Sequence, residues 1–365
     1  MKTVLKIDKF FLLSIILLTL AGFFVFSSAS LGLLARDGAS FQNVVSKQLI
    51  SLFIGIVGFL IISNINYRLV RKNSFYIFLF AILLNLLLFI PSISFTHGGA
   101  SRWIDLGFIT FQPGEFLKIS FIIYFATWLS MVKEKVASFS MGVIPYLSIV
   151  GILGILLYFQ SDMDTLIVIA FTGIIMLFIS GGRMRDIFTL FIILTLVLSI
   201  IAISKPYIIN RITSFLDPMK DSQSIGYQVQ QSLIAIGSGQ INGRGFGQSV
   251  QKFKYLPEPI GDSIFAVWAE EFGFLGSITL IILFLLFIFS SFRIAVRSKD
   301  IFARLASSGI AILIIIESFM NISSMLGIIP ISGMPLLFIS HGGTALIVIL
   351  CATGIIANIS KYQNT

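Results

Sequence analysis

The sequence has little charge, a single cysteine and no nucleotide-binding loop. Charged side chains make up 11% of the 365 residues, against roughly 25% in a soluble globular protein, and hydrophobic residues make up 57%. Cys351 lies in an apolar run, which excludes an internal disulfide framework and a cysteine-based metal site. No GxxxxGK[ST] motif occurs, so ATP-driven chemistry of the P-loop kind is not expected. Together these absences predict a polytopic membrane protein.

Basic residues outnumber acidic ones, 25 to 16, yet their distribution does not indicate binding of nucleic acid. They form short clusters between apolar runs, which is the pattern that orients membrane proteins, with Lys and Arg in cytoplasmic loops. With the N-terminus in the cytoplasm, the cytoplasmic clusters are residues 2–9, 68–72, 133–135, 183–185 and 293–304. The connection 205–263 is too long for this rule and is expected on the outer side.

Apolar runs define the expected fold. A helix that crosses the hydrocarbon layer needs about 20 mostly apolar residues, and isolated strands cannot satisfy their backbone groups in lipid. Ten such runs lie near residues 10–31, 47–66, 74–93, 115–132, 143–159, 163–181, 186–204, 264–292, 303–325 and 341–360. The first is too long and bulky for a signal peptide. The prediction is an all-α polytopic integral membrane protein with about ten transmembrane helices, both termini cytoplasmic, and a large extracytoplasmic loop between helices 7 and 8.

Two polar clusters interrupt the apolar background in the first half of the chain. GGASRWIDLGFITFQPGEFLKIS contains Glu115 and Lys118, which are three residues apart and therefore share one helical face. Charges within a membrane helix need a partner or an aqueous cavity, and a purely structural ion pair explains this pair equally well. QSDMDT places Asp162 and Asp164 at the start of an apolar run, where capping of that helix is the simpler explanation for Asp164.

Three further polar features lie in the second half. GYQVQQSLIAIGSGQINGRGFGQSVQKFKYLPEP combines glycines with basic residues such as Lys252, which suits an anion but is also typical of a flexible connector. Its YQVQQSLIAI segment is typical of an amphipathic surface helix. GIIPISGMPLLFISHGGTALI predicts irregular backbone that is buried in protein or lines an aqueous cavity. Asp262 directly precedes an apolar run, a position that also suits a helix cap.

Taken in order, these clusters resemble the motifs of the SEDS family, the FtsW and RodA group of bacterial cell-wall proteins. RWIDLGFITFQPGEFLK resembles the family's RWI…QPSEF.K signature, FQSDMDT its QPDLGT turn, and PISGMPLLFISHGGT its PVTGIPLPFISYGGS. RITSFLDP, YQVQQSLIAIGSG and SVQKFKYLPEPIGDSIFAVWAEEFG are similar to its extracellular loop. The resemblance covers nearly the whole chain and implies one membrane domain over 1–365 with an extracytoplasmic loop over 205–263. GFGQSVQKFKYLPE is slightly more similar to FtsW than to RodA.

The resemblance implies a peptidoglycan glycosyltransferase of the bacterial cytoplasmic membrane that serves cell division or elongation. Its substrate would be lipid II, a disaccharide-pentapeptide on undecaprenyl pyrophosphate, and Asp262 matches the loop acid that acts as general base in an inverting transfer. The implied partners are a class B penicillin-binding protein and other divisome or elongasome proteins, with no nucleic acid. No cofactor is certain. The departing pyrophosphate needs positive charge from basic residues or from a divalent cation, Mg²⁺ or Mn²⁺.

A set of substrate-binding residues also follows from the resemblance. Its members are Arg102, Glu115, Lys118, Gln160, Asp162, Lys252, Asn321, Ser340, Gly342 and Gly343.

The chain departs from the family pattern at several positions. They are Ser161 for Pro, Asp164 for Gly, Gly261 and Ser263 where Thr and Phe are common, Glu317 for Gln, Leu337 for Pro and His341 for Tyr. Glu317 and His341 are candidates for a pair near the outer mouth. Two other functions remain open: a lipid II flippase, and a non-catalytic division scaffold in which Asp262 caps a helix.

Overall fold

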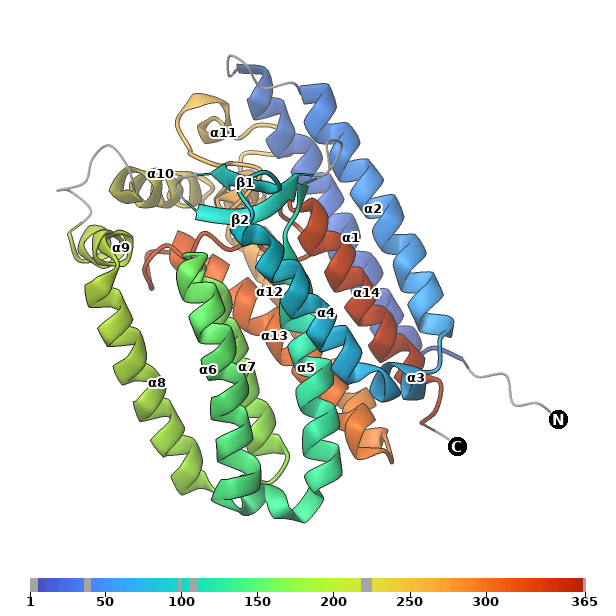
Figure 1. Ribbon diagram of the computed structural model, residues 1–365. Coiled ribbons are helices and arrows are strands. Elements are labelled where there is room, and N and C mark those ends of the chain that lie inside the picture. The colour runs from blue at the N-terminus through green and yellow to red at the C-terminus, as the bar shows by residue number, and fades with distance from the viewer. Residues whose placement is uncertain (1–5, 36–40, 98–99, 106–109, 218–224, 364–365) are drawn as a thin grey trace.

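The computed structural model describes residues 6–35, 41–97, 100–105, 110–217 and 225–363. Most of the described chain is helical, and long helices pack side by side in a bundle (Figure 1). Each predicted apolar run overlaps one helix of this bundle. They are α1 (Lys9–Ser30), α2 (Phe41–Asn64), α4 (Ser74–Leu86), α5 (Pro113–Val132), α6 (Ile144–Phe159), α7 (Met163–Ile179), α8 (Met184–Ser204), α12 (Ile264–Arg297), α13 (Ile301–Met325) and α14 (Gly343–Ser360).

The lengths of these helices confirm a polytopic membrane protein. Within the described residues, eight helices are long and apolar enough to cross a membrane, while α4 and α7 are shorter apolar helices. Shorter elements connect the long ones. They are η1 (Leu31–Ala35), α3 (Tyr67–Lys72), η2 (Leu87–Phe89), η3 (Lys133–Ala137), η4 (Phe139–Val143), α9 (Pro206–Leu216), α10 (Ile225–Ser238) and α11 (Gln251–Lys254).

A small antiparallel sheet was not expected from the sequence. Its strands β1 (Ser94–His97), β2 (Ala100–Asp105) and β3 (Thr110–Phe111) pair in the order β1-β2-β3, with Phe95 opposite Trp103. The segment follows the end of α4 and η2 and is too short and polar to continue as a span. Its aromatic and β-branched residues favour strands, which pair with one another and so satisfy their own backbone groups.

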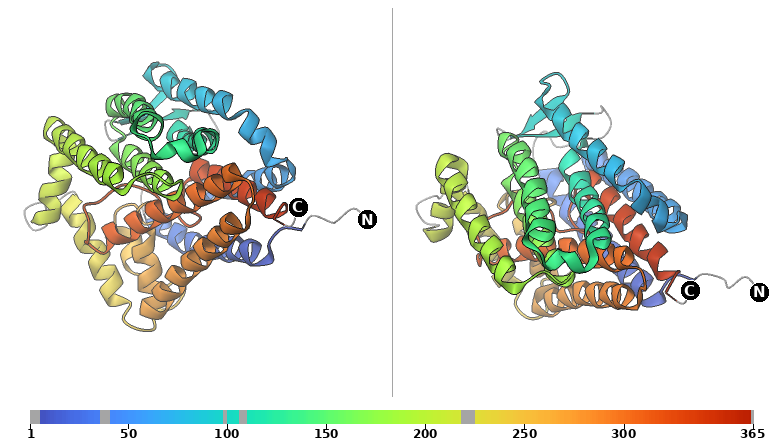
Figure 2. Two further views of the ribbon diagram at one scale, coloured as in Figure 1. Left: turned by 90° about the horizontal axis from the view of Figure 1, so that it is seen from below. Right: turned by 60° about the horizontal axis from the view of Figure 1, so that its bottom comes forward.

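The helices differ greatly in how deeply they are buried. Within the apolar windows of α13 and α14, 78% and 83% of residues are buried inside the protein, against 6% for α8. The bundle is therefore centred on α13 and α14, and α8 stands at its edge, as the views in Figure 2 show. At the base of α1, the Asp8 carboxylate accepts from Arg293 Nη2 at 2.7 Å, and the Asp8 N–H donates to Ser360 Oγ at 3.1 Å. These bonds tie the start of α1 to the ends of α12 and α14.

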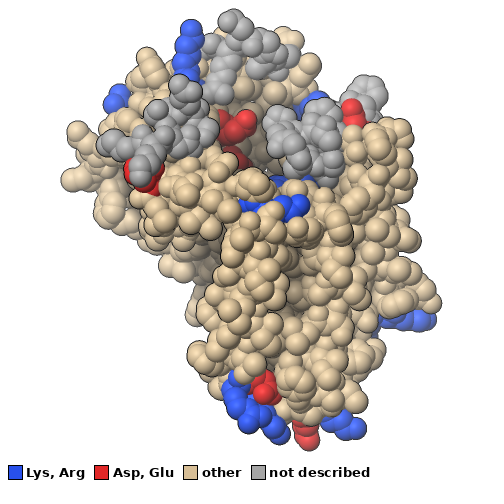
Figure 3. Space-filling view, turned by 60° about the vertical axis from the view of Figure 1, so that its left-hand side comes forward, with Lys and Arg blue, Asp and Glu red and all other residues tan. Residues whose placement is uncertain are grey.

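Polar structure is concentrated at the two ends of the bundle. The sheet, α10 and α11 lie together at one end (Figure 1). At the opposite end, basic side chains gather on the surface with a few acidic ones among them (Figure 3). Since Lys and Arg favour cytoplasmic loops, this separation supports the predicted placement of the sheet end on the outer side.

The glycine-rich stretch before α11 is interlocked with α12. α12 breaks at Gly273, where φ is +65°, and the freed N–H groups of Phe274 and Leu275 donate to carbonyl groups of Gln240 and Ile241 at 2.8 and 3.1 Å. Gly243, with φ +78°, lies so close to α12 that an added Cβ would overlap the Glu271 carbonyl oxygen. The glycine therefore serves close backbone packing on α12, so the anion-site and flexible-connector interpretations are both wrong for this position.

We predict that Gly243→Ala destabilises the protein by about 3 kcal/mol, because the new methyl group meets backbone and φ is positive. Gly237, inside α10, has open space around its Cβ position, so Gly237→Ala should be neutral or stabilise by up to about 1 kcal/mol. Thermal unfolding of both variants in detergent tests this contrast. Equal unfolding midpoints would contradict the interlock.

Candidate active site

A polar cavity of about 240 Å³ opens at the sheet end of the bundle. It is lined by residues of β2, the start of α5, the start of α7, the turn before α12 and the segment before α14. Figure 3 shows a recess near this end with acidic side chains inside it. Of the predicted site residues, the lining includes Arg102, Glu115, Asp162, Asp262, Gly342 and Gly343. The structure thus brings together residues that are up to 241 positions apart in the printed sequence.

Asp262 lies in the turn that leads into α12, and its backbone is fixed by Asn321 on α13. The Asn321 amide donates to the carbonyl oxygens of Asp262 and Met334, at 2.8 and 2.7 Å. Within the described chain, no hydrogen bond or ion pair engages the Asp262 carboxylate. Burial, reinforced by the carboxylate of Glu258, raises the pKa of Asp262 from 3.8 to about 6. An unpaired carboxylate with this pKa is suited to accept a proton near neutral pH.

The irregular segment before α14 packs against the same turn. Ser340 Oγ donates to the Gly261 carbonyl oxygen at 2.8 Å, and the His341 N–H donates to the Ile260 carbonyl oxygen at 2.7 Å. Ser340 Oγ also accepts from the Leu336 N–H at 2.8 Å. The predicted irregular backbone, buried in protein beside a polar cavity, is confirmed. Ser340 and Asn321 hold the Asp262 turn through backbone contacts.

Asp162 and Arg102 form an ion pair in the cavity wall. Arg102 Nη1 lies 3.7 Å from Asp162 Oδ1, and Arg102 Nη2 donates to the Ser161 carbonyl oxygen. Thr165 Oγ1 donates to Asp162 Oδ2 at 3.0 Å. Asp162 stands at the N-cap position of α7, but its side chain makes no capping hydrogen bond there. Asp164, for which capping was the simpler explanation, lies in the first turn of α7 and pairs with Arg211.

Arg211, on α9, is a cavity neighbour that the sequence reasoning did not single out. Its Nη1 donates to Asp164 Oδ2 at 2.9 Å and to the Ser332 carbonyl oxygen at 3.3 Å. A Cβ built on Gly333 would lie 3.2 Å from Arg211 Nη2 and 3.6 Å from Asp262 Oδ2. Gly333 therefore lies between the guanidinium and the Asp262 carboxylate. The available signal was RITSFLDP, which contains Arg211 and matches the family's loop.

Lys118 lies behind the cavity in a buried triad. Its Nζ contacts Glu115 Oε1 at 2.9 Å and Glu317 Oε2 at 2.5 Å, and all three side chains are buried. The expected ion pair of Glu115 with Lys118 is present, and Glu317 joins it. The suggested pairing of Glu317 with His341 is wrong, because Glu317 binds Lys118. Lys118 is absent from the cavity lining, so the expected substrate contact is not supported.

Two other expected substrate contacts lie within the protein interior. Lys252 is 0% exposed, and its Nζ donates to Glu271 Oε1, Ser28 Oγ and the Gly247 carbonyl oxygen at 2.7, 2.8 and 2.9 Å. With its three donors in use, it holds the loop to α1 and α12. Gln160 is buried, and its amide donates to the Asn85 carbonyl oxygen at 2.9 Å. Both side chains have partners inside the protein, and neither belongs to the lining of the polar cavity, so the structure does not support the predicted substrate contacts.

His341 is a cavity residue with an unusually well-defined ring. Its Nδ1 lies 3.0 Å from Gln48 Oε1, and the ring stacks on Phe26 with centroids 5.6 Å apart. Burial, together with the ammonium of Lys47, lowers the pKa of the His341 imidazole from 6.5 to about 4. The ring is therefore neutral at physiological pH.

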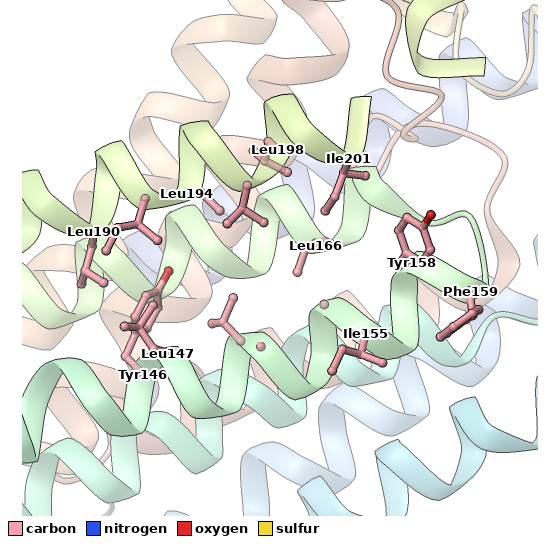
Figure 4. A pocket seen from close by; sticks show the side chains of 15 residues that line it. Tyr146, Leu147, Ile155, Tyr158, Phe159, Leu166, Leu190, Leu194, Leu198 and Ile201 are labelled. Atoms are coloured by element: carbon pink, nitrogen blue, oxygen red, sulfur yellow. The ribbon is translucent and has the colours of Figure 1, made fainter. Parts of the chain in front are cut away.

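A second cavity, of about 360 Å³, lies between α6, α7 and α8 (Figure 4). Its lining is aliphatic and aromatic, and the Tyr146 hydroxyl at one end donates to the Ala170 carbonyl oxygen at 2.8 Å. No lining residue carries a charge, so this cavity offers no acid–base chemistry at neutral pH. The polar cavity, by contrast, is lined by four carboxylates and by Arg102.

The carboxylates do not form a resident metal site in the described residues. No group of three or more His, Cys, Asp or Glu side chains there is arranged to hold an ion. Three of the four cavity carboxylates are already paired with Lys or Arg. A divalent cation at this site would need most of its oxygen ligands from a substrate.

Comparison with known proteins identifies relatives over nearly the full length. A family model described as "Cell cycle protein", for FtsW, RodA and SpoVE, matches residues 8–365. A probable peptidoglycan glycosyltransferase FtsW of Geobacter sp. (strain M18) is 35% identical over 99% of this chain and 98% of its own length. The stage V sporulation protein E of Bacillus subtilis (strain 168) is 34% identical over 96% of both chains.

Solved structures share the fold. A chain of a peptidoglycan synthase complex, described as coordinating polymerization and crosslinking, matches with a TM-score of 0.79 at 24% identity, over 98% of this chain and 99% of that one. The rod shape determining protein RodA of Thermus thermophilus matches with a TM-score of 0.71 at 22% identity, over 98% of both chains. These likenesses establish a common architecture.

The buried triad gives a stability prediction. Lys118→Met removes the cation that contacts both buried carboxylates and should cost about 3–5 kcal/mol. Glu317→Gln keeps an acceptor for Lys118 and leaves one buried ion pair, so we expect near-neutral stability. Thermal unfolding in detergent measures both, and an equal loss in the two variants would contradict the triad's charge balance.

Proposed function

The chain belongs to the cell cycle protein family of FtsW, RodA and SpoVE, and from this premise we propose that it is a peptidoglycan glycosyltransferase that polymerises lipid II. The fold supports this role because the polar cavity lies at one end of the bundle, where a membrane-anchored donor presents its sugar. The relatives named as peptidoglycan glycosyltransferases match over nearly the whole chain. The protein acts at the outer face of the bacterial cytoplasmic membrane, in cell division or elongation.

The main observation behind this proposal is the unpaired carboxylate of Asp262. Glu115, Asp162 and Asp164 also line the cavity, but each is paired with a Lys or Arg side chain. Asp262 alone among these four has neither an ion-pair nor a hydrogen-bond partner for its carboxylate within the described contacts, and its raised pKa matches the needs of a general base. The N-cap of α12 is Ser263, so Asp262 is not the helix cap that the scaffold alternative requires.

The proposed step is an inverting displacement. The C4 hydroxyl of one N-acetylglucosamine attacks C1 of the donor's N-acetylmuramic acid, and its proton passes to Asp262. The bond between C1 and the phosphate oxygen breaks, and the electron pair leaves with undecaprenyl pyrophosphate. Because pyrophosphate is already a good leaving group, one carboxylate is enough, unlike the carboxylate pair of most glycosidases.

Positive charge for the leaving group comes from Arg102 and Arg211. Arg102 lines the cavity, and Arg211 lies at its edge beside Gly333. Lys118 and Lys252 are excluded by their buried partners. A Mg²⁺ or Mn²⁺ ion would bind at this site together with the substrate, whose pyrophosphate would supply most of the oxygen ligands of the ion. The ion would then add further positive charge beside the leaving group.

The flippase alternative has less support. Moving a pyrophosphate headgroup across the bilayer needs a polar path, and polar lining in the described cavity is confined to one end. The polar triad deeper in the bundle is sealed by its own ion pairs. The implied partner, a class B penicillin-binding protein with other divisome or elongasome proteins, would cross-link the glycan made at this cavity.

We predict that Asp262→Asn abolishes glycan polymerisation, lowering the rate by at least about 100-fold, because the amide cannot accept the hydroxyl proton. The assay uses purified full-length protein with labelled lipid II, with and without the transpeptidase partner. Glu258→Gln, a matched change four residues away on an exposed side chain, should retain activity. Polymer from Asp262→Asn would sink the assignment, and flipping without polymer would favour the transporter.

The pH profile gives a second test. Asp262 acts as a base only when deprotonated, so a pKa of about 6 predicts a kcat/KM that falls about tenfold per pH unit below pH 6 and levels off above pH 7. Glu258→Gln removes a like charge and should move this limb to lower pH. A profile in which Glu258→Gln leaves the limb unmoved would contradict the electrostatic cause.

A further inference from the structure

The His341 ring is held by three separate elements. Phe26 of α1 stacks on one face at an interplanar angle of 20°, and Gln48 of α2 binds Nδ1. The His341 backbone N–H is fixed on the Ile260 carbonyl oxygen in the turn that carries Asp262. The imidazole therefore has one position relative to the Asp262 turn.

These contacts also fix which ring nitrogen carries the proton. The Gln48 oxygen can only accept, so Nδ1 must be the N–H nitrogen of the neutral ring. Nε2 then carries a lone pair, and no described residue donates to it. His341 lines the polar cavity together with Asp262. A residue of the cavity lining thus has a ring nitrogen that can accept a hydrogen bond and that no residue in the described part of the chain engages.

We propose that His341 is a substrate-positioning residue whose Nε2 accepts a hydrogen bond from a hydroxyl or N-acetyl N–H of the sugar that reacts at Asp262. This inference rests on the proposed glycosyltransferase function. A neutral acceptor repels phosphate oxygens, which also only accept, so the group it contacts belongs to a sugar and not to the pyrophosphate. The shared turn at residues 260–262 sets the spacing between this contact and the base.

A purely structural role does not account for these features. A phenylalanine would stack on Phe26 equally well and would leave no partly buried nitrogen without a partner, which costs free energy. Gln48 is itself 7% exposed, and its amide would be an unneeded polar group beside a phenylalanine. The hydrogen bond to Gln48 is explained if its role is to keep the proton on Nδ1 and so leave Nε2 as an acceptor for the substrate.

The first test compares His341→Phe and His341→Gln in lipid II polymerisation. Loss of one hydrogen bond to the sugar in His341→Phe should lower kcat/KM about 10-fold, mainly through KM. Because Gln48 also loses its partner, thermal unfolding is measured to verify that the variant is folded at the assay temperature. His341→Gln, which restores an acceptor, should recover part of the loss. Equal kcat/KM in His341→Phe and wild type would overturn the proposal.

The second test uses Gln48→Glu and separates positioning from packing. A carboxylate beside Nδ1 favours the doubly protonated ring, in opposition to Lys47, the charged group that faces it from the same helix. Nε2 then becomes a donor at low pH. The ratio of variant to wild-type kcat/KM should rise about 10-fold between pH 6 and pH 8.5, whereas a ratio independent of pH would contradict the assigned role of the lone pair.

Failure of the proposed function is recognised separately. If wild type and transpeptidase partner together make no polymer, that function fails, and binding of fluorescent lipid II to purified wild type and His341→Phe then decides this proposal. An approximately 10-fold weaker binding by His341→Phe supports the sugar contact, and equal binding overturns it.

Discussion

The site depends on how irregular backbone is satisfied inside a helical bundle. The turn before α12 and the segment before α14 are both non-helical, so their carbonyl groups need donors that no regular element supplies. The Asn321 amide donates to one carbonyl in each segment and so joins them at a single side chain. The Ser340 hydroxyl and the His341 N–H donate further hydrogen bonds from the segment before α14 to the turn before α12. Asp262 is held by its backbone, which leaves its carboxylate free for chemistry.

The buried charged side chains named above are paired with an opposite charge, whereas Asp262 at the cavity is not. In a bundle this apolar, a buried charge is costly unless it is paired, and Lys118, Lys252 and Asp164 all have ionic partners. Asp262 is only partly buried at the cavity and has none among the described residues, and the partial loss of solvent appears as its raised pKa. The property that makes Asp262 unfavourable as a structural residue is the one that makes it useful as a base.

The sequence predicted the helices well because apolar length is a local property. It also predicted Arg102, Glu115, Asp162 and Asp262 at one cavity, through motifs whose order matched a family. It failed for Lys252, because a lysine among glycines and glutamines looks solvated until the buried carboxylate of Glu271 is placed beside it. The contact of Arg211 with Asp164 joins residues 47 positions apart, and no periodicity reports such a pairing. The strands were missed because a membrane-span criterion scores only long apolar runs.

In the proposed reaction, the base must lie near the cations that stabilise the departing pyrophosphate without forming an ion pair with them. Gly333 lies between Arg211 and Asp262 and so separates the cation from the carboxylate. Its φ of +64° and missing side chain let the segment pass between Arg211 and Asp262, at 3.2 and 3.6 Å from the site where a Cβ would stand. Arg211 is meanwhile engaged by Asp164 and by the Ser332 carbonyl oxygen. The guanidinium thus adds positive potential to the cavity, which lowers the pKa of Asp262 against the larger effect of burial, while its direct ion pair stays with Asp164. Asp164, a departure from the family's glycine, therefore helps to keep Asp262 unpaired.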